Sequence, residues 1–227
     1  MNQLGIVTGL VSETDCLRAI GRVGLLAIRC AGADARRAQA LARGLAEAGC
    51  VALASFGLAG GLDSALHSGD VILADRVVGD DAIFQAEGAW HARAHALLRG
   101  EAGLTVGLLA GADVTVGTPE EKQRLHEKTG AIAVDMESPA VASTARQFNL
   151  PFLAVRVIAD TADRRVPAWL SGVIDEAGAV KPGAFCAGLL KRPGDLADIA
   201  RLAGANRRAL TSLRSVAALL GPGLGFL

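Results

Sequence analysis

Short β-branched or Leu-rich runs alternate with longer amphipathic stretches along the 227 residues of the chain. Strands that alternate with helices are typical of a largely parallel sheet covered by helices, so the pattern predicts an α/β fold. The apolar runs of strand length are 3–9, 23–29, 50–55, 70–78, 103–110, 131–135 and 152–159.

Two of the amphipathic stretches carry clear signals for helix ends. One begins at Asp34, a residue suited to capping a helix N-terminus, continues with strong helix formers and reaches Gly49. The other opens with Thr118 and Pro119, followed by two glutamates that favour a helix N-terminus. Both stretches are therefore predicted to be helices.

The C-terminal third of the chain has a different pattern. A helix is expected over 137–148, and after the strand that ends near residue 160 prolines interrupt a mainly helical sequence until a last helix at 195–219. Because no linker or internal repeat divides the chain, we expect one domain over 1–227, with a mainly helical part from about 161.

Composition narrows the function classes. Lys and Arg total 23 and Asp and Glu total 23, a balance that argues against a nucleic-acid partner. The four cysteines and four histidines lack the spacing of a metal site, and the cysteines lack that of a disulfide scaffold. The N-terminus lacks a secretion signal, so a cytoplasmic protein without metal is expected.

Polar residues that follow predicted strands are the first candidates for chemistry, because ligands collect at the carboxyl ends of strands in open parallel sheets. Glu13 follows the first strand, where it could act as a base on water or be a solvated surface charge. Arg156 interrupts an apolar strand that ends in Asp160. A cation there needs a partner, so we expect Arg156 to reach a carboxylate or an anionic ligand.

Two further segments could bind a ligand. The Glu137 carboxylate could hold two sugar hydroxyls beside the apolar Met136, or it could only favour a helix N-terminus. A glycine-rich segment after 50–55 could bring backbone amides close to a phosphate or hydroxyl, or it could be a tight turn. Its candidate residues are Ser55, Gly57, Leu58, Ala59, Gly60 and Gly61.

In their order and spacing, these segments resemble the nucleoside phosphorylase/nucleosidase superfamily over most of the chain. GIVTGL, AVDMES, RVIADTADRRVP and LLKRPGDLADIARLA are most similar to the hopanoid-associated phosphorylase group, with methylthioadenosine/S-adenosylhomocysteine nucleosidases next nearest. The superfamily motifs are Glu13, SFGLAGGL at 55–62, GDVILAD at 69–75, VDMES at 134–138 and RVIAD at 156–160.

The resemblance implies a single three-layer α/β/α domain around a twisted mixed sheet, assembled as a homodimer or larger homo-oligomer. It implies cleavage of the N-glycosidic bond of a purine nucleoside, and for the nearest group the release of adenine from lipid-linked adenosylhopane. Asp160 would protonate N7 of the departing base, and Glu137 would hold the ribose hydroxyls with Met136 packed against the sugar. Arg156 would contact the 2′-hydroxyl side, an attacking phosphate or Glu137.

The resemblance leaves the nucleophile open. Glu13 matches the glutamate with which nucleosidases activate water. A phosphorylase would instead need amides and cations, such as Arg156, Arg18 or the glycine-rich segment, around inorganic phosphate as co-substrate, and a glutamate there would repel it. No other cofactor is expected.

The chain departs from adenine nucleosidases at Val114, where those relatives place an aromatic residue that stacks on the base. It also looks short over 79–100, where relatives cover the substrate, and an open site would suit a bulky lipid at the ribose 5′ position. The enzymatic alternatives are a methylthioadenosine/S-adenosylhomocysteine nucleosidase or another purine nucleoside phosphorylase. The competing class is a noncatalytic nucleoside-binding or scaffold protein.

The C-terminus carries a basic helix that leads into residues 215–227, which have no charged side chain. A basic stem with an apolar end could make peripheral contact with an anionic membrane, or the tail could cover a hydrophobic groove on its own chain or on a partner. The basic residues of this stem are Lys191, Arg192, Arg201, Arg207, Arg208 and Arg214.

Overall fold

The computed structural model describes residues 3–20, 25–79 and 82–226, and its elements alternate as the hydrophobic pattern predicts. The strands are β1 (Leu4–Thr8), β2 (Leu26–Cys30), β3 (Ala52–Gly61), β4 (Val71–Val78), β5 (Ile83–Gln85), β6 (Leu104–Gly111), β7 (Ala133–Asp135) and β8 (Phe152–Asp160). The helices are α1 (Val11–Arg18), α2 (Ala35–Glu47), α3 (Gly88–Leu98), α4 (Pro119–Thr129), α5 (Ser138–Gln147), α6 (Pro182–Lys191) and α7 (Leu196–Leu220), with the 3-10 helices η1 (Ala168–Val173) and η2 (Pro193–Asp195).

The described strands form one mixed sheet that is open on one side and closed on the other. β2, β1 and β3 run parallel at the open side. β8 pairs with β3 in parallel and with β4 antiparallel, β6 lies parallel to β4 and to β7, and β7 returns antiparallel to β3. These five strands therefore make a closed ring, in which the long β3 belongs to both parts of the sheet.

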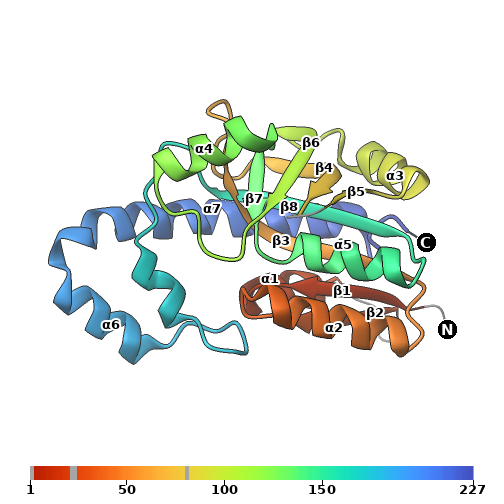
Figure 1. Cartoon of the computed structure of the whole chain (residues 1–227), viewed down its shortest axis with the longest axis horizontal. Coiled ribbons are helices and arrows are strands. Elements are labelled where there is room, and N and C mark those ends of the chain that lie inside the picture. The colour runs from red at the N-terminus through yellow and green to blue at the C-terminus, as the bar shows by residue number, and fades with distance from the viewer. Residues whose placement is uncertain (1–2, 21–24, 80–81, 227) are drawn as a thin grey trace.

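Helices cover both faces of the sheet and give three layers (Figure 1). α2 and α5 pack against each other on one face, and α1, α3 and α7 pack on the other. Each face has its own buried apolar cluster, which includes Ala42 and Val141 on the first face and Leu17 and Leu213 on the second. The α/β class that the hydrophobic pattern predicts and the mixed central sheet that the resemblance implies are confirmed.

The predicted helix ends are confirmed at α2 and α4. The Asp34 carboxylate accepts a hydrogen bond from the Arg37 amide at 2.8 Å. The Thr118 hydroxyl accepts one from the Glu121 amide at 3.2 Å, and Pro119 is the first residue of α4. Gly130 ends that helix with a φ of 70°, a conformation that side chains with a Cβ rarely adopt.

The segment 55–61 is the main correction to the predicted elements. The prediction ended this strand at residue 55 and placed a loop or turn after it, whereas β3 continues to Gly61 and stays paired with β8 over most of that length. Glycines favour loops in a sequence, but here Gly57 lies within the strand because side chains from other elements leave no space for a Cβ. β5, α1 and α3 were not predicted, and the start of the predicted strand 23–29 lies outside the described residues.

The C-terminal residues pack against α3 of the same chain. Trp90 Nε1 donates a hydrogen bond to the Leu224 carbonyl at 2.7 Å, Arg93 Nε donates to the Gly225 carbonyl at 2.9 Å, and Leu224 is fully buried. The tail thus covers a groove of its own chain, which was the alternative to contact between the tail and a membrane. No helix among the described residues combines the length and hydrophobicity needed to cross a bilayer.

Residues 165–195, here called the arm, connect β8 to α7 and project from the body of the molecule (Figure 1). The arm contains η1, a hairpin closed by the pairing of Ile174 with Val180, and α6. The hairpin reaches the turn after β1, where the Val11 amide donates to the Gly178 carbonyl at 3.1 Å. The predicted helical C-terminal part therefore includes a projecting segment.

Candidate active site

A cavity of about 280 Å³ lies where the ends of β1, β3, β7 and β8 meet. Arg156, Ser55, Gly57 and Gly61, which the sequence also proposed, are not among its lining residues. The predicted site residues that line it are Glu13, Leu58, Ala59, Gly60, Val114, Met136, Glu137 and Asp160.

Glu13 belongs to the first turn of α1 and is buried, so the expectation of a loop residue, and the alternative of a solvated surface charge, are both wrong. Its carboxylate accepts hydrogen bonds from the amides of Gly9 at 2.7 Å, Leu10 at 3.0 Å and Leu58 at 2.9 Å. Burial raises the pKa of Glu13 above its ordinary value, although Arg156 and these amides oppose the shift. The position is thus a fixed carboxylate at the cavity wall.

Arg156 reaches carboxylates, as its place in an apolar strand predicts. Its guanidinium is fully buried, forms an ion pair with Asp135 through Nε, and lies 3.4 Å from Glu137 Oε2 through Nη2. The same Nη2 donates to the hydroxyls of Ser55 at 2.5 Å and Ser138 at 3.2 Å. Burial lowers the pKa of Arg156, but the neighbouring carboxylates more than compensate and hold it above its ordinary value.

Glu137 stands between this cation and the cavity. It is the N-cap residue of α5 but makes no capping hydrogen bond with its side chain, so the interpretation that it only supports the helix is not favoured. Burial raises its pKa to about 8, with Asp135 and Glu13 adding to the shift and Arg156 opposing it. Glu137 therefore keeps its proton to higher pH than an ordinary glutamate does.

This shift predicts a stability that depends on pH. Because the pKa of Glu137 is about 8 in the folded chain and about 4.5 ordinarily, the folded state binds more protons between these values. The free energy of unfolding should fall as pH rises through that window, by at most about 1.4 kcal/mol per pH unit from this group. Urea unfolding of Glu137→Gln should show a smaller slope, and an unchanged slope would contradict the assignment.

Two glycines allow these side chains to converge. A Cβ on Gly57 would lie 2.7 Å from Arg156 Nη1 and would also collide with the Glu13 carboxylate. A Cβ on Gly9 would lie 2.7 Å from Glu137 Oε1. The glycine-rich segment thus makes room for charged side chains in a strand, and the predicted phosphate-cradling loop is not present there.

Asp160 is paired with Lys122, a residue that sequence reasoning missed. Lys122 is fully buried, and its Nζ donates to Asp160 Oδ2 at 2.5 Å and to the carbonyls of Thr161 at 2.7 Å and Arg164 at 3.0 Å. Burial raises the pKa of Asp160, and Lys122 opposes the shift. A lysine near the N-terminus of α4 runs against the helix dipole, which is the signal the sequence offered.

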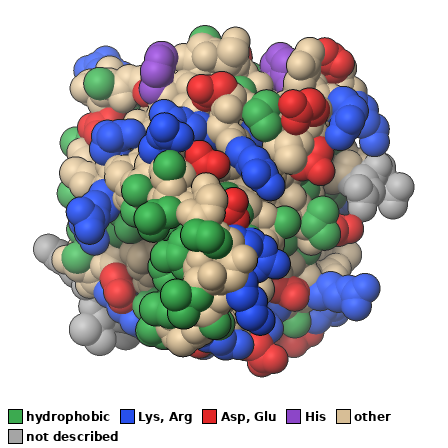
Figure 2. Space-filling view, turned by 90° about the vertical axis from the view of Figure 1, so that its left-hand side faces the viewer, with side chains coloured by type: hydrophobic (Ala, Val, Ile, Leu, Met, Phe, Trp, Pro, Cys, Tyr) green, Lys and Arg blue, Asp and Glu red, His purple; other side chains and the backbone are tan. Residues whose placement is uncertain are grey.

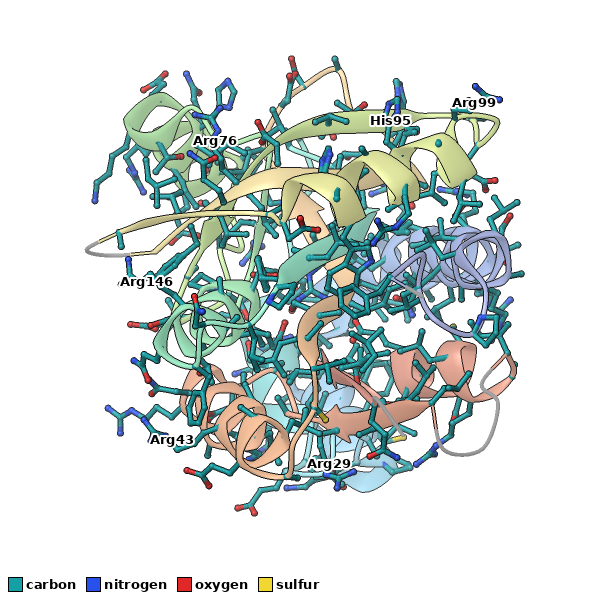
Figure 3. All side chains as sticks on the ribbon, turned by 90° about the vertical axis from the view of Figure 1, so that its right-hand side faces the viewer. Arg29, Arg43, Arg76, His95, Arg99 and Arg146 are labelled. Carbon is teal, nitrogen blue, oxygen red and sulfur yellow. The ribbon has the colours of Figure 1, made fainter. Side chains whose placement is uncertain are left out.

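The rim of the cavity contains residues from parts of the chain far apart in sequence. Val114 is 72% exposed there, and the described lining residues include no aromatic side chain. Val166 and Ile174 of the arm and Asn206 of α7 complete the wall and were not predicted. No histidine lines the cavity among the described residues, and His95 projects from the outer surface of α3 (Figure 3).

The fold and this cavity define an α/β protein with a carboxylate-rich small-molecule site at its strand ends. The model of the Phosphorylase superfamily matches residues 19–181, and the chain belongs to that superfamily. A 5'-methylthioadenosine/S-adenosylhomocysteine nucleosidase of Staphylococcus aureus (strain JH9) is 31% identical over an alignment of 126 positions that covers 47% of this chain. The match spans about half of that relative, 55% of its length.

Solved structures share the fold over nearly the whole chain. The Helicobacter pylori nucleosidase of the same name, bound to butyl-thio-DADMe-Immucillin-A, has a TM-score of 0.67 at 20% identity and covers 95% of this chain and 97% of its own. The futalosine hydrolase of the same organism has a TM-score of 0.66 at 19% identity, with the same coverage. These similarities confirm the fold that the resemblance implied.

Proposed function

We propose that this protein cleaves the N-glycosidic bond of a purine nucleoside and that water is the nucleophile. The observation that carries the proposal is the convergence of Glu13, Met136, Glu137 and Asp160 on one cavity. The similarity to proteins named as methylthioadenosine/S-adenosylhomocysteine nucleosidases supports it.

At the base end, Asp160 is suited to donate a proton. Burial raises its pKa, which favours the protonated form, and Lys122 fixes the position of the carboxyl group. As the bond from C1′ to N9 breaks, its electron pair leaves with the purine and the proton from Asp160 neutralises the base at N7. The ribose carries the developing positive charge.

At the sugar end, Glu137 and Met136 lie side by side in the cavity wall. A protonated Glu137 can donate to one ribose hydroxyl and accept from the other, so it can hold both. Arg156 keeps this carboxyl group in place from behind the wall. Arg156 acts as a positioning residue. Of the three contacts that the resemblance left open for it, this role supports the contact with Glu137.

The lack of a cation in the described part of the wall favours water over phosphate. Glu13, Asp135, Glu137 and Asp160 line the cavity, and its described lining residues include no Lys or Arg. A phosphate dianion would meet carboxyl groups there without a cation, whereas Glu13 can take a proton from water as the oxygen bonds to C1′. Arg18, the other cation considered, is exposed and pairs with Asp15.

The proposed substrate has a bulky 5′ substituent, as in adenosylhopane. A second cavity of about 440 Å³ shares Ala112 and Met136 with the first, so further open space lies next to Met136, beside the proposed sugar position. The exposed Val114 leaves the rim open. Methylthioadenosine is the second candidate substrate, because of the named relatives. We further propose a cytoplasmic homodimer or larger homo-oligomer that uses no cofactor.

The decisive experiment measures adenine release from adenosylhopane and methylthioadenosine, and hypoxanthine release from inosine, each with and without phosphate. We expect adenine release from adenosylhopane at the highest rate, with no dependence on phosphate. The sugar product should carry a hydroxyl, and not a phosphate, at C1′. Phosphate dependence would show a phosphorylase. Tight adenine binding without release from any nucleoside would refute the proposal and favour the noncatalytic binding protein.

Glu13→Gln tests the nucleophile directly. The substitution keeps the shape of the side chain but removes the base, so hydrolysis should fall about 10²- to 10⁴-fold. Adding phosphate should not restore base release. Glu47→Gln, at an exposed position of α2, is the matched control and should keep full activity. Normal turnover by the Glu13 variant would exclude Glu13 as the base.

A further inference from the structure

Helix α6 in the arm presents an apolar outer surface. Residues 182–190 carry no charged side chain, and no residue of α6 is buried. Leu190 is 83% exposed, and Val180 and Leu196, which precede and follow α6 in the sequence, are 58% and 56% exposed. Figure 2 shows the face toward which the arm projects, where hydrophobic side chains gather and Lys and Arg side chains border them. Exposed apolar surfaces of this kind mark interaction sites.

The inner side of α6 packs within the arm. The exposure of the outer side therefore follows from the fold. The Phe185 ring packs against Trp169 at 5.9 Å between centroids, and Gly188 lets the helix approach the same indole closely. Trp169 Nε1 donates to Asp195 Oδ2 at 2.9 Å, which ties η1 to the start of α7. One side of the helix is thus anchored while the other faces outward.

Charge indicates what covers the outer side. Lys181 precedes α6, Lys191 and Arg192 end it, all three are exposed, and no acidic residue occurs between Glu176 and Asp195. An apolar helix with basic ends matches the interface of an anionic bilayer, where apolar side chains enter the acyl boundary and cations meet headgroups.

A second copy of the chain matches this surface less well. A twofold-symmetric contact through α6 would pack the two helices against each other through the same patch. In the antiparallel arrangement, Lys181 of one copy would lie near Lys191 and Arg192 of the other. Like charges would then face each other at both ends of the contact.

We propose that the arm docks this protein on the surface of an anionic phospholipid membrane, with α6 lying in the interface. Val166 and Ile174 of the same arm line the cavity, so docking brings the cavity rim close to the lipid. The use of this docking rests on the proposed function, since a nucleoside attached to a lipid stays in the membrane. The membrane contact thus lies on the arm, and the C-terminal tail is packed on its own chain.

Sedimentation with phosphatidylcholine vesicles, with and without phosphatidylglycerol, tests the proposal on the full chain. The wild type should bind the anionic vesicles and lose binding as salt increases. Lys191→Glu combined with Leu190→Gln should weaken binding at least about tenfold, because it removes both the charge and the apolar contact. Val106→Gln, at an exposed apolar position on β6, is the matched control and should bind as the wild type does.

Cys186 provides an independent readout on α6. It is exposed, whereas Cys16 and Cys50 are buried and Cys30 is half-buried, so an environment-sensitive fluorophore can be attached to Cys186 in a Cys30→Ser background. Anionic vesicles should shift its emission to shorter wavelength. An unchanged spectrum, or equal sedimentation of the double variant and the wild type, would overturn the proposal. Dimerisation abolished by the double variant, without vesicle binding, would overturn it in favour of a second copy.

Activity on methylthioadenosine separates this inference from the proposed function. The double variant should cleave this water-soluble nucleoside at the wild-type rate while it fails to bind vesicles. If the wild type binds anionic vesicles but cleaves no nucleoside, the docking surface stands and the proposed function fails. If it cleaves methylthioadenosine without binding vesicles, the docking proposal fails alone.

Discussion

Asp160→Asn is expected to lower base release by about 10²- to 10⁴-fold, because the amide cannot donate a proton to the leaving base in the way a carboxylic acid does. The chain should still fold, since the amide oxygen can accept the hydrogen bond from Lys122 that the carboxylate accepts at 2.5 Å, but it should be less stable because the buried Lys122 loses the charge opposite it. Steady-state adenine release and thermal unfolding, measured side by side, separate the two effects.

The neighbouring Asp163 provides the control for this prediction. Asp163 is exposed and interacts with the Thr161 hydroxyl, outside the cavity wall, so Asp163→Asn should cleave at the wild-type rate. Lys122→Met should leave a proton donor in place, but the pKa of Asp160 should rise because its opposing charge is gone. Its activity should therefore extend to higher pH. Near-normal turnover by Asp160→Asn would exclude Asp160 as the acid.

Arg156→Met is expected to cost about 3–5 kcal/mol of folding free energy, the usual effect of removing one partner from a buried ion pair. Asp135 and Glu137 would lose their ion-pair partner, and the nearby Glu13 would lose an opposing charge. Urea unfolding of the variant and the wild type measures this difference.

The sign of the pH dependence follows from the carboxyl groups. Without Arg156 the pKa values of Glu13 and Glu137 in the folded chain rise further above the ordinary ones, so the folded variant binds more protons than the unfolded chain. The deficit should therefore be smallest in acid and grow as pH rises. Arg43→Met is the control, because Arg43 projects from the surface of α2 (Figure 3). Its guanidinium is exposed and makes surface contacts, with Glu47 at 3.9 Å and with the Gln147 side chain at 3.2 Å. Equal stability of the two variants would contradict the role of Arg156.

Local chemistry made much of the fold predictable from sequence. Asp34 and Thr118 mark helix starts through hydrogen bonds to amides within the same turn, which a sequence displays directly. The strand through Gly57 was missed because its glycine is required by Glu13 and Arg156, which approach from distant parts of the chain. The glycine content of this segment suggested a loop, but its packing against other elements makes it part of a strand.

The sequence predicted the site residues that lie at the ends of strands. It did not predict the residues that reach the site from other elements. Met136, Glu137 and Asp160 follow strands that converge, so their meeting in one cavity follows from topology. Lys122 lies on a helix of mainly polar residues, where a lysine is ordinarily solvated, and its burial depends on carbonyls of the segment after β8. Ile174 reaches the cavity through the arm, whose path no spacing in the sequence indicates.

The closed ring of β3, β8, β4, β6 and β7 has a consequence for how a ligand enters. β3, β7 and β8 contribute cavity residues and are hydrogen-bonded to neighbours within the ring, so separating them would require opening the most protected part of the molecule. Val166 and Ile174 belong to the arm, which is held by fewer contacts. Substrate admission and product departure are therefore expected at the rim near Val114 and the arm, while the sheet keeps the reacting groups in register.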